Sequence, residues 1–323
     1  MIDRYIAYIR DIRRYSSRTA DIYRHVLEDF VATMGESMGT WSELKPNVIR
    51  AYEVAMMKRP EVTSANTVNL HLSVISGFCR FLIKEGVLKS NPVKLVPKMK
   101  TRKSLPTFFR REHMDKYFER TDIYASEEYL EILMSDIRAE SVKELYEKRL
   151  ARLIISLLYG LGLRRSELIS MNVSSVDFGR KVVKVHGKGD KTREIPILNA
   201  LCEEISLYLK AVEALVEGER SLKEPLLITF SGKRLYPVYV DKVVKSELSG
   251  EDGHTGRKSP HVLRHTLATE LMNEDVDLNS IKELLGHSSL AATQVYTHNS
   301  VARLRSIYKH AHPRAKNGGK HGD

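Results

Sequence analysis

The sequence predicts a mainly α-helical fold with a small β-sheet, divided into two domains. Its 323 residues exceed the roughly 250 to 300 at which a single core usually stops growing. Apolar residues recur at helical spacing along most of the chain, whereas strict alternation is confined to VVKVH (182–186) and TREIPI (192–197). A basic stretch gives way to an acidic one after Arg111, and such a switch marks a boundary.

The first domain is expected to be a helical bundle over residues 1–86. Ser16 or Ser17 can cap its first long helix, because side-chain oxygens accept the free N–H groups of a helix start. Pro46 favours the start of a second helix, and Ser64 favours the start of a third. The third helix should end near Gly86. Its apolar stripe consists of Val68, Leu72, Ile75, Phe78 and Leu82.

Residues 87–106 are expected to form a basic linker. NPVKLVPKMKTRKSLP contains three prolines among its lysines and arginines, and proline resists helix, so the segment should stay extended. Two interpretations of its charge remain open at this point: it can follow a phosphate backbone, or it can be a solvated tether. The candidate DNA-binding residues are Lys94, Lys98, Lys100, Arg102 and Lys103.

The second domain is expected over residues 107–313, followed by a flexible tail at 314–323. Helical spacing continues from Glu112 to Leu158. The two alternating segments then form a hairpin, because GKGDK between them supplies the glycines of a turn. LLITF (226–230) is a candidate third strand, and helices resume from Pro260.

Composition indicates a polyanionic partner such as nucleic acid. The chain has 52 Lys plus Arg against 41 Asp plus Glu, a net charge of +11. No run approaches the ~18 uncharged apolar positions of a membrane span, and charges interrupt the start MIDRYIAYIRDIRRY, so a cytoplasmic location is expected. Cys79 and Cys202 are far apart and outside any metal-binding pattern, so neither a disulfide framework nor a zinc site is expected. No metal and no other cofactor is predicted for the chain.

Six basic or tyrosyl side chains form the candidate catalytic site. Each has an ordinary structural explanation when it is taken alone. Together they suit attack on a phosphodiester, because guanidinium groups can hold the nonbridging oxygens on which negative charge gathers. The six residues are Arg164, Lys188, His261, Arg264, His287 and Tyr296.

Each of these residues can be given a chemical role. Arg164 and Arg264 suit the phosphate oxygens. A tyrosine hydroxyl has a pKa of about 10 and must lose its proton as it attacks, which makes His261 the candidate acceptor for Tyr296. Lys188, at the hairpin tip, can protonate the departing sugar oxygen. In addition, His287 can donate a hydrogen bond to the phosphate.

The motifs closely resemble those of the tyrosine site-specific recombinases, particularly the Xer group. GLRRSEL, the lysine in VHGKGDKTREIPI, HVLRH and LLGHSSLAATQVYTH match in order and spacing. The resemblance implies an N-terminal helical core-binding domain of the SAM-like kind and a C-terminal α+β catalytic domain. It places the six residues in the family's catalytic positions and Glu167 in an accessory acidic position. It also implies DNA cleavage through a 3′-phosphotyrosyl intermediate and a Holliday junction.

The resemblance further implies particular partners. The substrate would be a double-stranded DNA recombination site, held by a homotetramer on two duplexes or by a heterotetramer with a second recombinase. A DNA translocase of the FtsK type is a further candidate. The stretch between Arg120 and Lys148 is longer and more acidic than the family's usual spacing; a solvated surface helix is the favoured interpretation, and contact with a partner protein is the alternative. SVARLRSIYKHAHPRA near the end can dock into a neighbouring subunit or pack on its own domain.

The expected biological role is DNA recombination that resolves chromosome or plasmid dimers, and thus serves chromosome partition and cell division. The first domain is expected to begin almost at Met1, without a preceding arm-binding domain, which favours this housekeeping role. Two alternatives remain: an integrase or invertase of a mobile element, which would carry out DNA integration by the same chemistry, and a non-catalytic architectural DNA-binding protein.

Overall fold

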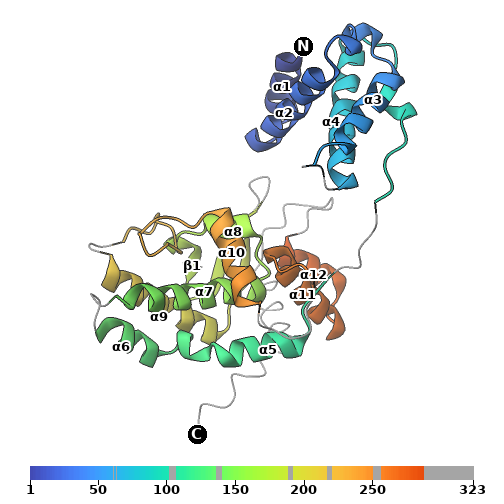
Figure 1. Ribbon diagram of the computed structural model, residues 1–323. Coiled ribbons are helices and arrows are strands. Elements are labelled where there is room, and N and C mark those ends of the chain that lie inside the picture. Colours follow the sequence, from blue (N-terminus) through green and yellow to red (C-terminus); the bar gives the residue numbers. More distant parts are fainter. Residues whose placement is uncertain are drawn as a thin grey trace. The chain divides into compact units, whose positions relative to one another are not determined.

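The computed structural model describes residues 1–60, 62, 64–101, 107–135, 140–187, 192–216, 220–249 and 256–286. The chain separates into two compact units, Met1–Leu105 and Pro106–Asp323 (Figure 1). The described part is mostly helical and contains one three-stranded sheet, as the sequence predicts.

The first unit is a helical bundle whose helices begin where the sequence places them. The Ser16 side chain accepts a hydrogen bond from the Thr19 N–H, and Ser64 accepts one from Thr67, so both caps are confirmed. The elements are α1 (Ile2–Ala7), a π-helical turn η1 (Tyr8–Ile12), α2 (Ser17–Met34), the 3-10 turns η2 (Gly35–Met38) and η3 (Trp41–Glu43), α3 (Pro46–Met57), α4 (Ala65–Lys84) and a 3-10 turn η4 (Pro92–Leu95).

Part of the expected linker belongs to the first unit's core. Pro92–Leu95 forms η4 rather than extended chain, so the expected extended conformation is wrong there. Val93 and Val96 are buried in the apolar core. The Asn69 amide of α4 exchanges two 3.0 Å hydrogen bonds with the main chain of Met99. The prolines prevent a long helix, but apolar residues between them still pack against α4.

The second unit is built around one buried helix. Its helices are α5 (Arg111–Arg120), η5 (Asp122–Ala125), α6 (Glu127–Ser135), α7 (Val142–Gly160), α8 (Arg165–Ser170), η6 (Val173–Ser175), α9 (Asn199–Leu215), α10 (Pro237–Glu247), α11 (Pro260–Asn273) and α12 (Leu278–Leu285). α7 packs against α9, α10 and α11. Every residue from Arg149 to Gly160 is buried, which explains why its apolar run is nearly continuous.

The sheet is antiparallel, with the order β1-β2-β3. β2 (Val182–His186) and β3 (Thr192–Pro196) form the expected hairpin, with Val185 opposite Arg193. The expected third strand at 226–230 is wrong, because Ile228 makes only an isolated bridge with Arg234. The third strand is β1 (Val176–Asp177), a two-residue segment too short for alternation to reveal.

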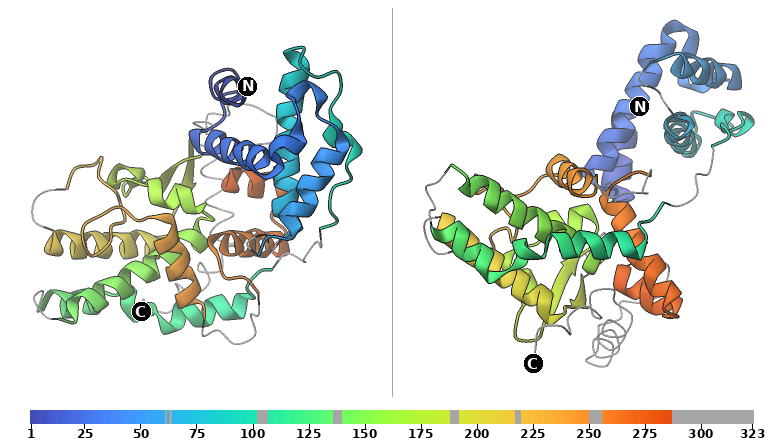
Figure 2. Two further views of the ribbon diagram at one scale, coloured as in Figure 1. Left: turned by 45° about the horizontal axis from the view of Figure 1, so that its top comes forward. Right: turned by 60° about the horizontal axis from the view of Figure 1, so that its bottom comes forward.

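Within the acidic stretch between Arg120 and Lys148, α6 lies at the end of this unit opposite to α11 and α12. The three views of Figures 1 and 2 agree on this placement. Tyr129, Leu130 and Leu133 of α6 are buried, and its glutamates Glu127, Glu128 and Glu131 are exposed. α6 is therefore an ordinary amphipathic surface helix. In the described ranges, every helix is too short or too polar to cross a membrane.

Candidate active site

Arg164 stands at the start of α8, where a tight turn leaves α7. Gly162 in this turn has a φ of 58°, which glycine adopts without strain. Glu167, three residues along, bonds back to the helix start: its Oε2 accepts the Arg164 main-chain N–H at 2.9 Å, and its Oε1 accepts Nη1 of the same arginine at 2.7 Å. A carboxylate at this position satisfies a free N–H of the helix start. It also fixes the direction of the Arg164 side chain.

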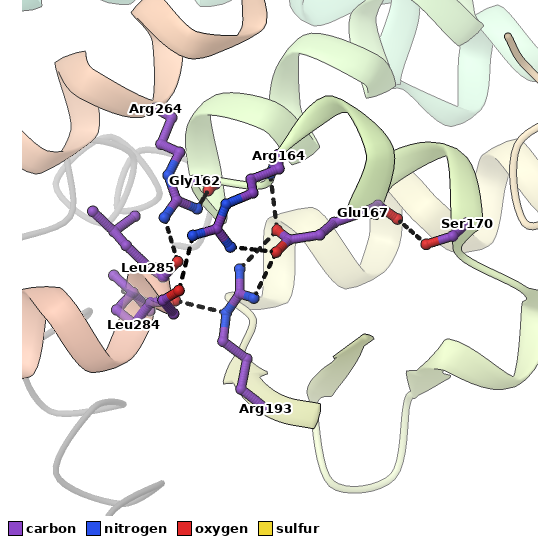
Figure 3. Close-up of polar contacts among 9 residues, drawn as sticks. Gly162, Arg164, Glu167, Ser170, Arg193, Arg264, Leu284 and Leu285 are labelled. Carbon is purple, nitrogen blue, oxygen red and sulfur yellow. Dashed lines mark hydrogen bonds and ion pairs between the residues drawn. The ribbon is translucent and has the colours of Figure 1, made fainter. Parts of the chain in front are cut away.

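Arg264 reaches the same place from α11, which begins at Pro260. Its side chain is buried, and Nη1 donates to the Gly162 carbonyl at 2.6 Å, while Nη2 donates to the Leu285 carbonyl. Burial, followed by repulsion from Arg164, lowers the pKa of Arg264 to about 10. The guanidinium therefore remains charged at neutral pH. Figure 3 shows the Arg164 and Arg264 guanidinium groups beside each other.

The sequence analysis missed a third arginine at the site. Arg193 of β3 is buried, and its Nη1 and Nη2 donate to Oε1 and Oε2 of Glu167 at 3.0 and 2.9 Å. Its Nε donates to the Leu284 carbonyl at 2.9 Å. A signal was available: Arg193 lies between Thr192 and Glu194, at an inward position of an alternating strand. A charge on the apolar face of a strand is rarely buried without a partner.

The end of α12 meets all three arginines. The carbonyls of Leu284, Leu285 and Gly286 accept hydrogen bonds from Arg193, Arg264 and Arg164, respectively (Figure 3). The last carbonyls of a helix lack partners within it and carry partial negative charge, so guanidinium groups suit them. Gly286 ends the helix in the left-handed conformation, with a φ of 62°. The helix end is thus fixed one residue before His287.

The cluster carries more positive than negative charge. Burial alone would raise the pKa of Glu167, but a hydrogen bond and attraction from Arg193, followed by hydrogen bonds from Arg164, hold that pKa below its ordinary value. One carboxylate therefore faces three guanidinium groups. An arginine side chain has five N–H donors, and the hydrogen bonds of Arg164 and of Arg264 within the described residues each use two. An anion with several oxygens is the ligand that suits this surplus.

The structure describes only some of the expected catalytic residues. It brings Arg164, Glu167 and Arg264 together. His261 is exposed on α11, one turn before Arg264. The other three expected catalytic residues, Lys188, His287 and Tyr296, lie outside the described residues. Of the candidate DNA-binding residues, Lys94, Lys98 and Lys100 are exposed, and Arg102 and Lys103 lie outside the described part.

Comparison with known families decides the class of this protein. Residues 2–86 match the phage integrase N-terminal SAM-like domain, and residues 123–303 match the phage integrase family. The chain belongs to the phage integrase family. It is a Xer-like tyrosine recombinase, an enzyme of the class that cleaves and rejoins DNA.

Similar curated proteins cover nearly the whole chain. The tyrosine recombinase XerC of Bacillus licheniformis is 33% identical over 97% of this chain and 96% of its own length. XerC of Bacillus pumilus is 32% identical over 98% of this chain and 97% of its own length. XerC of Chlorobaculum parvum is 30% identical over 97% and 94%.

Solved structures of recombinases share the fold. XerH bound to a palindromic difH substrate has a TM-score of 0.65 and 19% identity, and the match covers 95% of this chain and 83% of that one. The Tn1549 transposon integrase in complex with circular intermediate DNA has a TM-score of 0.64 and 16% identity, over 94% and 98%. A lambda integrase dimer bound to a COC′ core site has a TM-score of 0.62 and 18% identity, over 100% and 96%.

Proposed function

We propose that Arg164 and Arg264 bind the scissile phosphate of a DNA recombination site and that Tyr296 attacks it. One observation carries this proposal: the two guanidinium groups are held against the same helix end, in a cluster with a surplus of positive charge. The transition state of phosphoryl transfer gathers negative charge on the nonbridging oxygens. Fixed guanidinium groups stabilise that charge without having to reorganise.

The proposed reaction proceeds in two transesterifications. The Tyr296 hydroxyl oxygen bonds to phosphorus as the bond from phosphorus to the 5′ oxygen breaks, and His261 accepts the phenolic proton. Lys188 protonates the departing 5′ oxygen, while His287 donates a hydrogen bond to the phosphate. A 5′-hydroxyl of the partner duplex then attacks the 3′-phosphotyrosyl bond and releases tyrosine. The covalent link conserves the ester energy, so nucleotide hydrolysis is not part of the scheme.

We assign core-site binding to residues 1–86, joined by the linker 87–106 to cleavage by residues 107–313. The exposed Lys94, Lys98 and Lys100 would contact phosphates, as would Arg102 and Lys103. Four protomers, either of this chain alone or together with a second recombinase, would hold two duplexes and exchange strands through a Holliday junction. The DNA-bound recombinases that share the fold support a DNA-site partner.

Resolution of chromosome or plasmid dimers in the cytoplasm is the proposed role, with a translocase of the FtsK type as a candidate partner. The full-length likeness to proteins named XerC supports it. Mapping of the DNA bound by the protein in cells tests this role. One chromosomal locus without flanking element ends is expected. Binding concentrated at the ends of a mobile element would contradict the housekeeping role and favour integration.

A nicked duplex tests the chemistry. A binding site is first selected from random duplex DNA with the purified protein. A nick is then placed next to the cleavage position, so that the cut end diffuses away and the covalent intermediate is trapped. We call this substrate the selected nicked duplex. A covalent protein–DNA adduct should accumulate, and Tyr296→Phe should bind the duplex without forming it. Adduct formation by Tyr296→Phe, or bound duplex that is never attacked by the wild type, would contradict the proposal.

A further inference from the structure

We propose that Arg193 is a positioning residue that sets the orientation of Arg164 and ties it to the β2–β3 hairpin and the end of α12. This inference rests on the catalytic role proposed above for Arg164. Arg193 is not among the six expected catalytic residues. It would act through Glu167 and the main chain rather than by touching DNA.

Arg193 and Arg164 share one carboxylate. Oε1 of Glu167 accepts from Nη1 of Arg193 at 3.0 Å and from Nη1 of Arg164 at 2.7 Å. Oε2 accepts from Nη2 of Arg193 and from the Arg164 main-chain N–H, both at 2.9 Å. Each carboxylate oxygen therefore joins both arginines. Because two parallel bonds define a plane, Arg193 fixes the carboxylate plane to which Arg164 is bound.

The third donor of the Arg193 guanidinium group contacts the end of α12. Nε of Arg193 bonds to the Leu284 carbonyl, and the next two carbonyls of the chain bond to Arg264 and Arg164. Arg193 thus fixes the helix end that contacts the arginine pair. It does so from β3, the strand that follows the hairpin tip where Lys188 lies in the sequence. One buried side chain thus joins β3 to the start of α8, where Arg164 lies, and to the end of α12.

The Arg193 side chain packs closely against Gly286. A Cβ atom at Gly286 would lie 3.0 Å from Nη1 of Arg193 and 3.3 Å from its Cδ and Cζ atoms. Two features therefore favour glycine at this position. The backbone that ends α12 is left-handed, and the guanidinium group occupies the space that a side chain would need. The absence of a side chain lets Arg193 pass the helix end and reach Glu167.

A lysine could not replace this arginine. The side chains of Arg193 and Glu167 are only 7% and 2% exposed, so solvent cannot take over a lost hydrogen bond. An ammonium group is a point donor and lacks the planar fork that meets two carboxylate oxygens and a carbonyl at once. Arg193→Lys should preserve the charge but lose the orientation.

The turn between β1 and β2 of the same sheet offers a matched control. Arg180 donates to both carboxylate oxygens of Glu194 on β3, at 3.0 and 2.7 Å. This pair has the same fork geometry, but its side chains are 51% and 25% exposed. Arg180→Lys therefore makes the same chemical change beside the same sheet, away from Glu167 and the helix end.

The test compares single-turnover adduct formation on the selected nicked duplex at saturating protein, below the unfolding transition of each variant. Arg193→Lys should form the adduct about 10- to 100-fold more slowly, because a small misplacement of a catalytic group is that costly. The affinity of Arg193→Lys for the duplex should equal that of the wild type. Arg180→Lys should equal the wild type in both the rate of adduct formation and the affinity. An unchanged rate for Arg193→Lys, or an equal slowing by Arg180→Lys, would overturn the inference.

A double variant distinguishes positioning from general destabilisation. If Arg193 acts through Glu167, then Glu167→Gln should slow cleavage as well, and the double variant should be no slower than the worse single variant. Multiplying effects would show that Arg193 acts independently, and would overturn the inference. Arg164→Ala separates the two proposals. If this variant cleaves at the wild-type rate, the proposed function is refuted. If it is inactive while Arg193→Lys cleaves at the wild-type rate, only the positioning role of Arg193 is refuted.

Discussion

Each unit contains a network of charged side chains, partly exposed in the first unit and largely buried in the second, and the two networks differ in charge balance. In the first unit, Arg59 donates to both oxygens of Asp29 at 2.9 and 3.1 Å, and the Tyr52 hydroxyl donates to the same carboxylate at 2.6 Å. His71 lies 2.7 Å from that hydroxyl. Among the described residues, one carboxylate meets one guanidinium, so the two charges balance. It joins α2, α3 and α4 and serves the fold.

In the described part of the second unit, the network has three guanidinium groups for one carboxylate. Helix carbonyls compensate part of the surplus, but they carry only partial charge. Buried charge without full compensation is costly, and it persists at sites that bind an opposite charge. Charge imbalance, together with deeper burial, distinguishes the candidate active site from the structural network.

The largest effect is expected from Arg264→Ala. Adduct formation on the selected nicked duplex should fall by about 10²- to 10³-fold, as it does when a donor to a developing negative charge is removed. Much of the duplex affinity should remain, because many phosphate contacts share it. Rates from denaturing gels and affinities from fluorescence anisotropy give the two values. Equal loss of both would contradict a catalytic role.

Arg59→Ala is the matched change in the balanced network. It leaves Asp29 without its ion-pair partner, so the free energy of unfolding should fall by about 1–3 kcal/mol. Chemical denaturation followed by circular dichroism measures this loss. The cleavage rate at saturating protein, below the unfolding transition, should stay at the wild-type value. A specific loss of cleavage would remove the distinction between the two networks.

Gly162→Ala should disturb the arginine pair through packing. A Cβ atom there would lie 2.5 Å from Cδ2 of Leu285 and 3.0 Å from Cδ2 of Leu267, on a backbone with φ of 58°. We expect a loss of about 1–3 kcal/mol in unfolding free energy, accompanied by slower cleavage. Gly232→Ala is the control, because its φ is 75° but nothing lies within 4 Å. Similar losses in both variants would show that backbone strain alone matters.

Glu270 extends the comparison to a buried carboxyl group that a proton can neutralise. Burial raises its pKa to about 7, against the lowering effects of the Tyr159 hydroxyl and Arg111 and the raising effects of Asp115 and Glu112. The folded protein then binds more protons than the unfolded chain between about pH 4.5 and 7, so stability falls as pH rises through this window. Glu270→Gln should abolish that fall and raise stability at about pH 8 by about 1–3 kcal/mol.

Thermal unfolding at about pH 5 and about pH 8 measures this effect. The variant should gain melting temperature relative to the wild type at the higher pH and little at the lower one. A gain of the same size at both pH values would show that Glu270 is not titrating in the folded protein.

Exposed charges should affect affinity instead of chemistry, with the smallest effects. Lys98→Gln and Lys100→Gln should each lower the slope of binding against salt by about one unit. Neither should change the cleavage rate at saturating protein. Lys143→Gln on α7 is an exposed control outside the linker. Salt titrations of all three variants provide the measurement, and a slope unaffected by both linker changes would remove these lysines from the DNA interface.

Local signals account for what the sequence predicts well. Serine caps and apolar stripes define α2 and α4, and alternation defines β2 and β3, because these patterns depend on neighbouring residues. Motifs also place Arg164 and Arg264 at one site. By contrast, Val176–Asp177 becomes a strand only through its pairing with β2, and LLITF lacks such a partner. The role of Arg193 depends on Glu167, 26 residues away, so no local pattern contains it.

The central claim is that the surplus charge of Arg164 and Arg264 neutralises the scissile phosphate. The most direct measurement replaces that phosphate in the selected nicked duplex with a neutral methylphosphonate and follows adduct formation by Arg264→Ala. The neutral linkage has no negative charge to stabilise, so the variant should attack it much faster than it attacks the phosphate. Its rate on the methylphosphonate should approach that of the wild type on the same substrate. A variant as inactive on methylphosphonate as on phosphate would contradict the account.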